Sequence, residues 1–169
     1  VMEELKLDRS TKFLVISIEN ISKSRLNQLE EWKQLDNPNK SSVDRLNRKI
    51  ITEVNLNNDD EDNDESGRPS RANTQDTYKL YLEDVSTKKI TQAYENEPLR
   101  FLRTENTGTP LPIKLGGRLT VLKGALIYNG VLLLTNKNCE YHGIHADDAS
   151  YVSILNDGVI KKQIELLQL

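Results

Sequence analysis

Hydrophobic residues follow strand-like patterns in two separate parts of the chain. Residues 12–21 (KFLVISIENI) are apolar on both parities, which is typical of a strand buried on both faces. Residues 78–83 alternate apolar and polar side chains, so they predict a half-buried strand. Residues 87–95 continue this pattern after a short turn. The two segments are therefore expected to pair as a hairpin.

Two more strands are predicted between residues 118 and 135. Residues 118–128 are rich in apolar side chains, and Asn129-Gly130 supplies the pair of positive φ angles that a type I′ hairpin requires before the returning strand, residues 131–135. Gly124 inside the fourth strand indicates a bulge or a sharp coil, through which a small sheet curls. The pattern predicts a mainly β fold, a five-stranded barrel of the OB type.

The C-terminal part has the spacing of a helix. From a cap at Asp147, apolar residues recur near helical spacing to the end of the chain, and Asn156-Asp157-Gly158 is expected to break the helix in two. The OB-type barrel is thus predicted to carry a C-terminal helical segment.

A polar segment, residues 22–76, separates the first two strands. It holds nine of the 23 Lys and Arg residues and twelve of the 26 Asp and Glu residues, which leaves fourteen of each elsewhere. Apolar residues recur every three positions from Leu26 to Leu35 and every three or four from Val43 to Val54, so two short amphipathic helices are expected around a turn at Pro38. The acidic run, residues 59–65, is expected to be solvated and disordered.

Composition narrows the class of protein. A single cysteine, Cys139, excludes an internal disulfide and favours a reducing compartment. No apolar run is long enough to cross a bilayer, and no signal peptide is visible, so a membrane partner is not expected. The chain is expected to be a piece of a longer protein. The net charge of -3 argues against a general phosphate-neutralising surface.

Catalytic and metal-binding patterns are weak. Cys139, His142 and His145 have ligand-like spacing but no obvious fourth ligand, so zinc is not expected. The acidic run is not a calcium loop, because Glu65 stands where glycine is needed and Arg71 where the bidentate glutamate belongs. No nucleophile elbow, P-loop or dinucleotide motif is present. We therefore expect no enzyme activity and no cofactor.

Two blocks of sequence resemble a known family. YKLYLEDVSTKKITQAYENEPLRFL and LPIKLGGRLTVLKGALIYNGVLLLTNKN are similar to the OB domain of the RecQ-mediated genome instability protein 1 family, whose members are non-enzymatic partners of topoisomerase III and a RecQ-type helicase. The resemblance also covers the first strand with ISKSRLNQLEEW. It implies a nuclear protein with one OB domain over residues 1–169 and a long insertion, residues 22–76, between its first and second strands.

The resemblance further implies how such a domain works. The barrel would dock on the type IA topoisomerase, and the insertion would bias the opening and closing of its gate, favouring decatenation and dissolution of double Holliday junctions. DNA would be contacted indirectly or weakly. The expected partner-binding residues are Leu26, Leu29, Trp32, Leu35, Asn129, Gly130, Val131, Leu133 and Lys137.

Some of these residues also have purely structural interpretations. The Leu26–Leu35 set could instead cover the barrel itself, although a lone tryptophan in a polar insertion is a common partner anchor. Arg45, Arg48 and Lys49 could contact DNA at the gate or form a solvated helix face.

A different function, binding of single-stranded DNA, remains as the second hypothesis, because OB barrels stack bases on aromatic side chains of their second and third strands. Tyr78 and Tyr81 lie on opposite faces of their strand, so at most one can form a platform with Tyr94, and core packing is expected for the other. A general scaffold unrelated to DNA is the third class.

Overall fold

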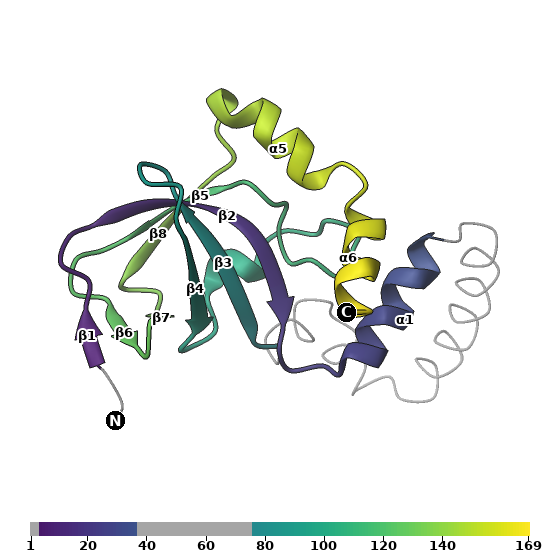
Figure 1. The fold of residues 1–169 in the computed structure, drawn as a ribbon, viewed down its shortest axis with the longest axis horizontal. Helices are drawn as coiled ribbons and strands as arrows, with labels where there is room; N and C mark the ends of the chain where they lie inside the picture. The colour runs from purple at the N-terminus through teal and green to yellow at the C-terminus, as the bar shows by residue number, and fades with distance from the viewer. Residues whose placement is uncertain (1–3, 37–75) are drawn as a thin grey trace, which may run out of the picture.

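The computed structural model describes residues 4–36 and 76–169. Within them the protein is mainly β, with one curled sheet and helices beside one of its ends (Figure 1). The strands are β1 (Glu4–Lys6), β2 (Thr11–Asn20), β3 (Tyr78–Asp84), β4 (Ile90–Glu95), β5 (Arg118–Val121), β6 (Leu126–Tyr128), β7 (Val131–Leu134) and β8 (Cys139–Gly143). The helices are α1 (Arg25–Asp36), α5 (Ala149–Asn156) and α6 (Val159–Leu167), with 3-10 turns η1 (Arg100–Arg103) and η2 (Ala146–Asp148).

The strand order is β1-β6-β7-β4-β3-β2-β5-β8, and the neighbours are antiparallel except β4 and β7. The sheet curls back on itself. β1 continues along the chain into β2, and β5 continues into β6. β1 pairs with β6 at one end of the strand order, whereas β2 pairs with β5 near the other end. Hydrogen bonds between Leu7 and the Gly124–Ala125 segment join these two ladders. One long antiparallel pair, bent at this point, therefore contributes to both halves of the curled sheet.

The predicted count of five strands is wrong, because the sheet has eight strands within the described residues. The predicted fourth strand is split into β5 and β6 at Gly124, whose φ of 94° interrupts the extended backbone. The other two are the short edge strands β1 and β8, which pair with β6 and β5. The Asn129-Gly130 hairpin between β6 and β7 is confirmed, with φ angles of 51° and 81°.

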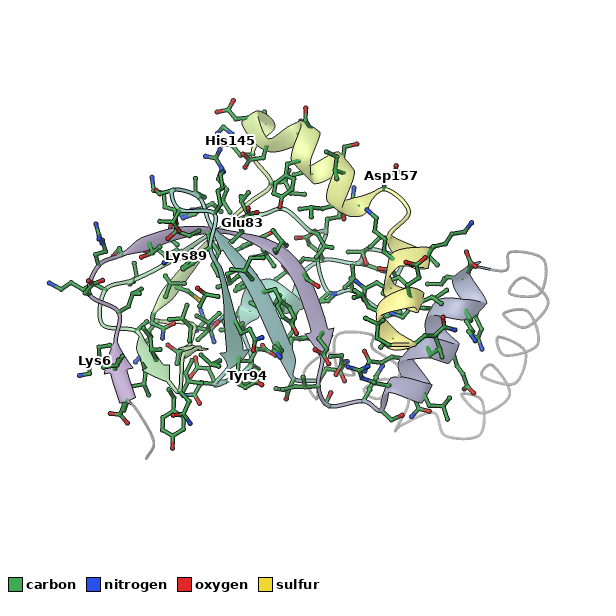
Figure 2. The ribbon with its side chains drawn as sticks, viewed as in Figure 1. Lys6, Glu83, Lys89, Tyr94, His145 and Asp157 are labelled. Carbon is green, nitrogen blue, oxygen red and sulfur yellow. The ribbon has the colours of Figure 1, made fainter. Side chains whose placement is uncertain are left out.

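The C-terminal helical segment is divided as expected. α5 ends at Asn156, Gly158 adopts a φ of 64°, and α6 begins at Val159. Figure 2 shows His145 and Asp157 at opposite ends of α5. The Tyr151 hydroxyl in α5 donates to Glu83 Oε1 at 2.6 Å, which ties this helix to the end of β3.

The core lies inside the curl of the sheet and is built from alternate residues of its strands. Fully buried members include Val15, Leu80, Leu82, Leu119, Val121, Leu132 and Leu134. Tyr78 is 2% exposed and belongs to this core, whereas Tyr81 lies on the outer face, so their predicted opposite orientation is confirmed.

Of the predicted insertion, residues 22–36 and the last residue, Asp76, lie in the described part of the chain. Its first expected helix is present as α1. The second expected helix, the turn at Pro38 and the acidic run lie outside the described residues, so the assignment of 22–76 to one inserted loop of a single domain stays a prediction.

Candidate functional site

The chain leaves β2 and returns to β3 at one hydrogen-bonded place, which we call the neck (residues 20–24 and 76–78). The Ile21 amide donates to the Thr77 carbonyl at 2.9 Å. The Thr77 amide donates to Ser22 Oγ at 3.2 Å, and Ser22 Oγ lies 3.3 Å from an oxygen of the Asp76 carboxylate. The two ends of the excursion between β2 and β3 are therefore held side by side.

Polar side chains fix how α1 leaves the neck. Ser24 caps the helix, because its Oγ accepts a hydrogen bond from the Asn27 amide at 3.1 Å. The buried Gln28 amide group donates to the carbonyl oxygens of Asn20 and Lys23 at 2.9 and 3.0 Å. These bonds join the helix to the end of β2 and to the turn after it, and they set the direction of the helix.

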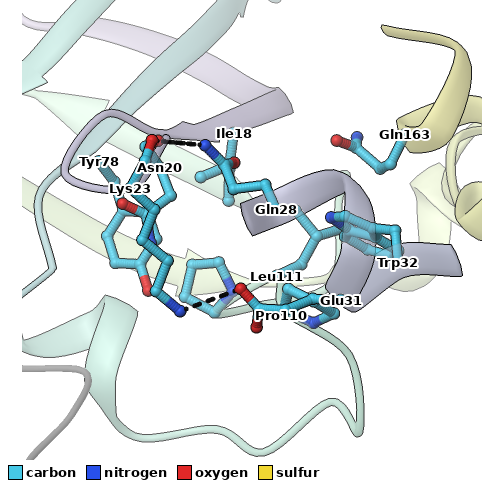
Figure 3. Close-up of a pocket in the computed structure, with 11 residues that line it drawn as sticks. Ile18, Asn20, Lys23, Gln28, Glu31, Trp32, Tyr78, Pro110, Leu111 and Gln163 are labelled. Atoms are coloured by element: carbon cyan, nitrogen blue, oxygen red, sulfur yellow. Dashed lines mark hydrogen bonds and ion pairs between the residues drawn. The ribbon is translucent and has the colours of Figure 1, made fainter. Parts of the chain in front are cut away.

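Trp32 holds α1 against the barrel. Its side chain is 2% exposed and belongs to the core cluster. Figure 3 shows it beside a small cavity of about 20 Å³, with Gln28 and Tyr78 also in the lining. The Leu26–Leu35 set is divided between core and solvent: Leu29 and Leu35 are half-buried, and Leu26 is 65% exposed. In this structure Trp32 therefore covers the barrel. Contact of the Leu26–Leu35 set with a partner stays a prediction.

α6 completes this region of the molecule. It packs beside α1, and the Arg25 guanidinium donates to the Leu169 carbonyl at 3.2 Å. A groove of about 370 Å³ lies between the C-terminal residues and the outer face of the sheet, with Ile16, Ile90 and Leu166 among its apolar lining residues.

The other expected partner-binding residues lie on the β6–β7 hairpin and the turn after it. Asn129, Gly130 and Lys137 are exposed, while Val131 and Leu133 are half-buried on the face opposite the buried Leu132 and Leu134. Figure 1 shows β6 and β7 at the far side of the sheet from α1 and α6. The structure thus places the expected partner residues in two separate regions. The expected DNA contacts Arg45, Arg48 and Lys49 lie outside the described residues.

Two tyrosines and a lysine share the outer face of β3 and β4. The Lys79 ammonium lies 5.0 Å from the Tyr81 ring centroid and 5.7 Å from that of Tyr94. Hydrogen bonding with Tyr81 raises the pKa of Lys79, so the cation is retained at neutral pH. Figure 2 shows Tyr94 at the end of the β3–β4 pair away from Glu83. This face offers two aromatic rings around one positive charge.

The cysteine and histidines form no metal site. Cys139 is buried, its Sγ lies 3.2 Å from the Thr135 carbonyl oxygen, and burial raises its thiol pKa to about 11. His142 Nε2 lies 2.9 Å from the hydroxyl Oγ1 of Thr120. The described residues contain no group of three or more His, Cys, Asp or Glu side chains that could hold a metal ion. Among them there is also no helix with the length and apolarity to cross a membrane.

A buried ion pair beside the neck has no counterpart in the sequence-based predictions. Glu95 and Arg103 are 2% and 8% exposed in their side chains, with Oε2 and Nη1 separated by 2.5 Å. Glu95 ends a predicted strand and Arg103 follows Leu102, and nothing in the spacing of the two residues would have singled them out as a pair.

Comparison with known families identifies the fold family of the chain. A family model described as "RMI1, N-terminal OB-fold domain" matches residues 2–151. No curated protein matches the chain.

Proposed function

The chain belongs to the RMI1 N-terminal OB-fold domain family, and on that premise we propose that it is a non-catalytic subunit of a nuclear topoisomerase III–RecQ helicase complex. Membership in this family of non-catalytic OB domains supports a role in genome stability. In the proposed mechanism the barrel docks on the type IA topoisomerase, and the insertion at residues 22–76 modulates the opening of its gate. Decatenation and double Holliday junction dissolution are the processes it would promote.

The observation that supports this proposal best is the neck. Hydrogen bonds from Ile21 to Thr77 and from Thr77 to Ser22 bring the two limbs of the excursion together at one end of the paired strands β2 and β3. The entropic cost of closing a loop rises only logarithmically with its length, so the barrel can carry a long insertion without losing its own stability. Such an insertion is free to act on another molecule.

Shortening the insertion tests the mechanism directly. Residues 37–74 are replaced by a Gly-Ser linker, which leaves α1 and the buried Trp32 in place. Decatenation and relaxation by topoisomerase III are then measured with the parent and the shortened chain. We expect the barrel to stay folded, with a cooperative thermal transition, while stimulation of decatenation falls more than relaxation changes. Unchanged decatenation would contradict the assignment of this activity to the insertion.

Affinity separates the proposed partner from DNA. At ~150 mM salt the protein should bind a type IA topoisomerase far more tightly than it binds single-stranded DNA, because its net charge of -3 gives little counterion release. Calorimetry or fluorescence anisotropy measures both affinities. Stronger binding to DNA, with a steep dependence on salt, would instead support the second candidate function.

That second candidate, single-strand binding, is favoured by the outer face of β3 and β4. Tyr81 and Tyr94 flank Lys79 there, and bases stack on aromatic rings with about 1–3 kcal/mol per base. Tyr81→Ala and Tyr94→Ala should then weaken DNA binding by about tenfold or more each. Tyr128→Ala, on β6, is the matched control and should leave binding unchanged. Equal affinity in all of these variants would exclude the platform.

A further inference from the structure

The sheet ends unevenly beside the neck. β3 begins at Tyr78, whereas the last residue that β4 pairs with β3 is Tyr94, opposite Lys79. The Thr77 carbonyl faces β2, where it accepts from the Ile21 amide. Backbone groups of successive residues in an extended chain point to opposite sides. The Asp76 carbonyl and the Tyr78 amide therefore face the β4 side, beyond the last residue of β4 that pairs with β3.

The Glu95 and Arg103 side chains fill this position. Glu95 Oε1 accepts a hydrogen bond from the Tyr78 amide at 2.9 Å, and Arg103 Nη2 donates to the Asp76 carbonyl at 2.6 Å. One acceptor and one donor thus meet the two backbone groups as a neighbouring strand would. The same two side chains also bind the backbone of Leu99, whose amide donates to Glu95 Oε2 at 2.7 Å.

The pair is costly to bury, which argues for a geometric role. Glu95 and Arg103 are held by two contacts, of 2.5 and 3.1 Å, at side-chain exposures of 2% and 8%. The desolvation of two such charges roughly cancels their attraction, so an apolar pair of similar size is often as stable. What an apolar pair cannot supply is directed hydrogen bonding to Asp76 and Tyr78. The guanidinium also lies 5.6 Å from the Tyr78 ring.

We propose that Glu95 and Arg103 are a positioning pair: their side chains replace the β3–β4 pairing that stops at Tyr94, and they fix the direction in which the chain returns from the insertion. This inference rests on the proposed function, in which the insertion acts on the topoisomerase gate. The pair does not touch the partner. It acts through Asp76 and Tyr78, keeping the return limb against the entry limb at Ser22.

The first variant removes both charges together, as Glu95→Met/Arg103→Met, so that no lone buried charge is left to unfold the barrel. Cooperative thermal unfolding should be retained. Hydrogen exchange at the Tyr78 amide should become about tenfold faster or more, because that amide loses its charged acceptor. Stimulation of topoisomerase III decatenation should fall severalfold, with the shortened-insertion chain as the lower limit.

A matched control removes another ion pair of the described chain. Arg118→Met/Asp148→Met deletes the contact of 2.7 Å that joins β5 to η2, outside the neck. It should change neither exchange at Tyr78 nor decatenation.

A disulfide can restore the neck without the ion pair. Ser22→Cys/Asp76→Cys replaces two side chains whose oxygens lie 3.3 Å apart, and Cys139, the one native thiol, is buried. In the Glu95→Met/Arg103→Met background, oxidation should return decatenation toward the parent level and reduction should abolish that recovery. A merely structural role for the pair predicts no such reversible change. The parent chain, assayed oxidised and reduced, shows any redox effect on the enzyme itself.

Two results would overturn the inference, and they are distinct from failure of the proposed function. Parental exchange at Tyr78 in the Glu95→Met/Arg103→Met variant would mean that the pair does not hold the return limb. Faster exchange with parental decatenation, while the shortened insertion does lose activity, would mean that the direction of the limb does not matter. If the shortened insertion also retains decatenation, the proposed function fails, and exchange at Tyr78 still reports on the neck.

Discussion

Trp32 offers the sharpest quantitative test, because the structure makes it a packing residue of a helix that was expected to meet a partner. Its side chain is 2% exposed, among the core residues and beside a cavity of only about 20 Å³. An aromatic side chain buries about 150–250 Å², which at about 25 cal/mol per Å² corresponds to roughly 4–6 kcal/mol. Trp32→Ala should therefore lower the unfolding free energy by about 3–5 kcal/mol, the range found for such truncations in cores.

The assay uses the fact that Trp32 is the only tryptophan. Its fluorescence in the parent chain reports the docking of α1, and far-UV circular dichroism reports the sheet. Urea titrations with both probes give the parent stability, and circular dichroism alone gives that of Trp32→Ala. Leu26→Ala on the same helix is the matched control; because Leu26 is 65% exposed, its effect should stay within about 0.5 kcal/mol.

Two results would refute the packing argument. One is an unchanged urea midpoint in Trp32→Ala, and the other is parent emission at the wavelength of a solvated indole. A Trp32→Ala chain of parental stability that binds topoisomerase III less tightly would restore the view of Trp32 as an exposed partner anchor. A smaller loss of unfolding free energy in Trp32→Ala, with fluorescence and circular dichroism of the parent giving two separate transitions, would mean that α1 undocks on its own. The free energy of docking α1 would then be smaller than the cost expected for truncating Trp32.

Three further predictions follow from local chemistry. Because burial raises the pKa of Cys139 to about 11, its alkylation by iodoacetamide near pH 8 should be slow until urea unfolds the chain. Mass spectrometry measures the labelling, and rapid labelling of the native protein would contradict this expectation. The Arg118 hydrogen bond lowers the pKa of Asp148 below 3.8, so the folded state binds that proton more weakly than the unfolded state, and the stabilisation by this pair is lost as pH falls through this range. Asp148→Asn should therefore flatten the loss of stability measured below about pH 4, and an unchanged acid profile would exclude the linkage. Gly117→Ala places a methyl group on the Tyr141 hydroxyl and should cost about 1–3 kcal/mol in thermal unfolding, whereas an unchanged melting temperature would mean that the Tyr141 ring moves freely.

Much of the sheet was predictable because its signals are local. Alternation in residues 78–83 predicted β3 with Tyr78 and Tyr81 on opposite faces, and Asn129-Gly130 predicted the β6–β7 hairpin. The edge strands β1 and β8 were not predicted, because they have only three and five residues. β1 is exposed throughout, and β8 alternates in burial over too short a length to be recognised.

The candidate site was less predictable, because its contacts join distant parts of the chain. Trp32 in a polar segment suggested an exposed anchor, and only the position of α1 beside the core explains its burial. The pair Glu95 and Arg103 could not be found from spacing, since its partners Asp76 and Tyr78 lie far away in the sequence.

The sequence by itself determined where the longer strands and the described helices lie, where the tight turn lies, and which face of β3 is buried. Side-chain period and the φ angles of Asn and Gly are local properties. The tertiary structure decided how many strands the sheet has, which of them are neighbours, and which polar groups become buried. Those outcomes depend on hydrogen bonds between segments far apart in the chain. A charged side chain such as Glu95 looks solvated until the fold brings it beside a backbone amide that has no strand partner.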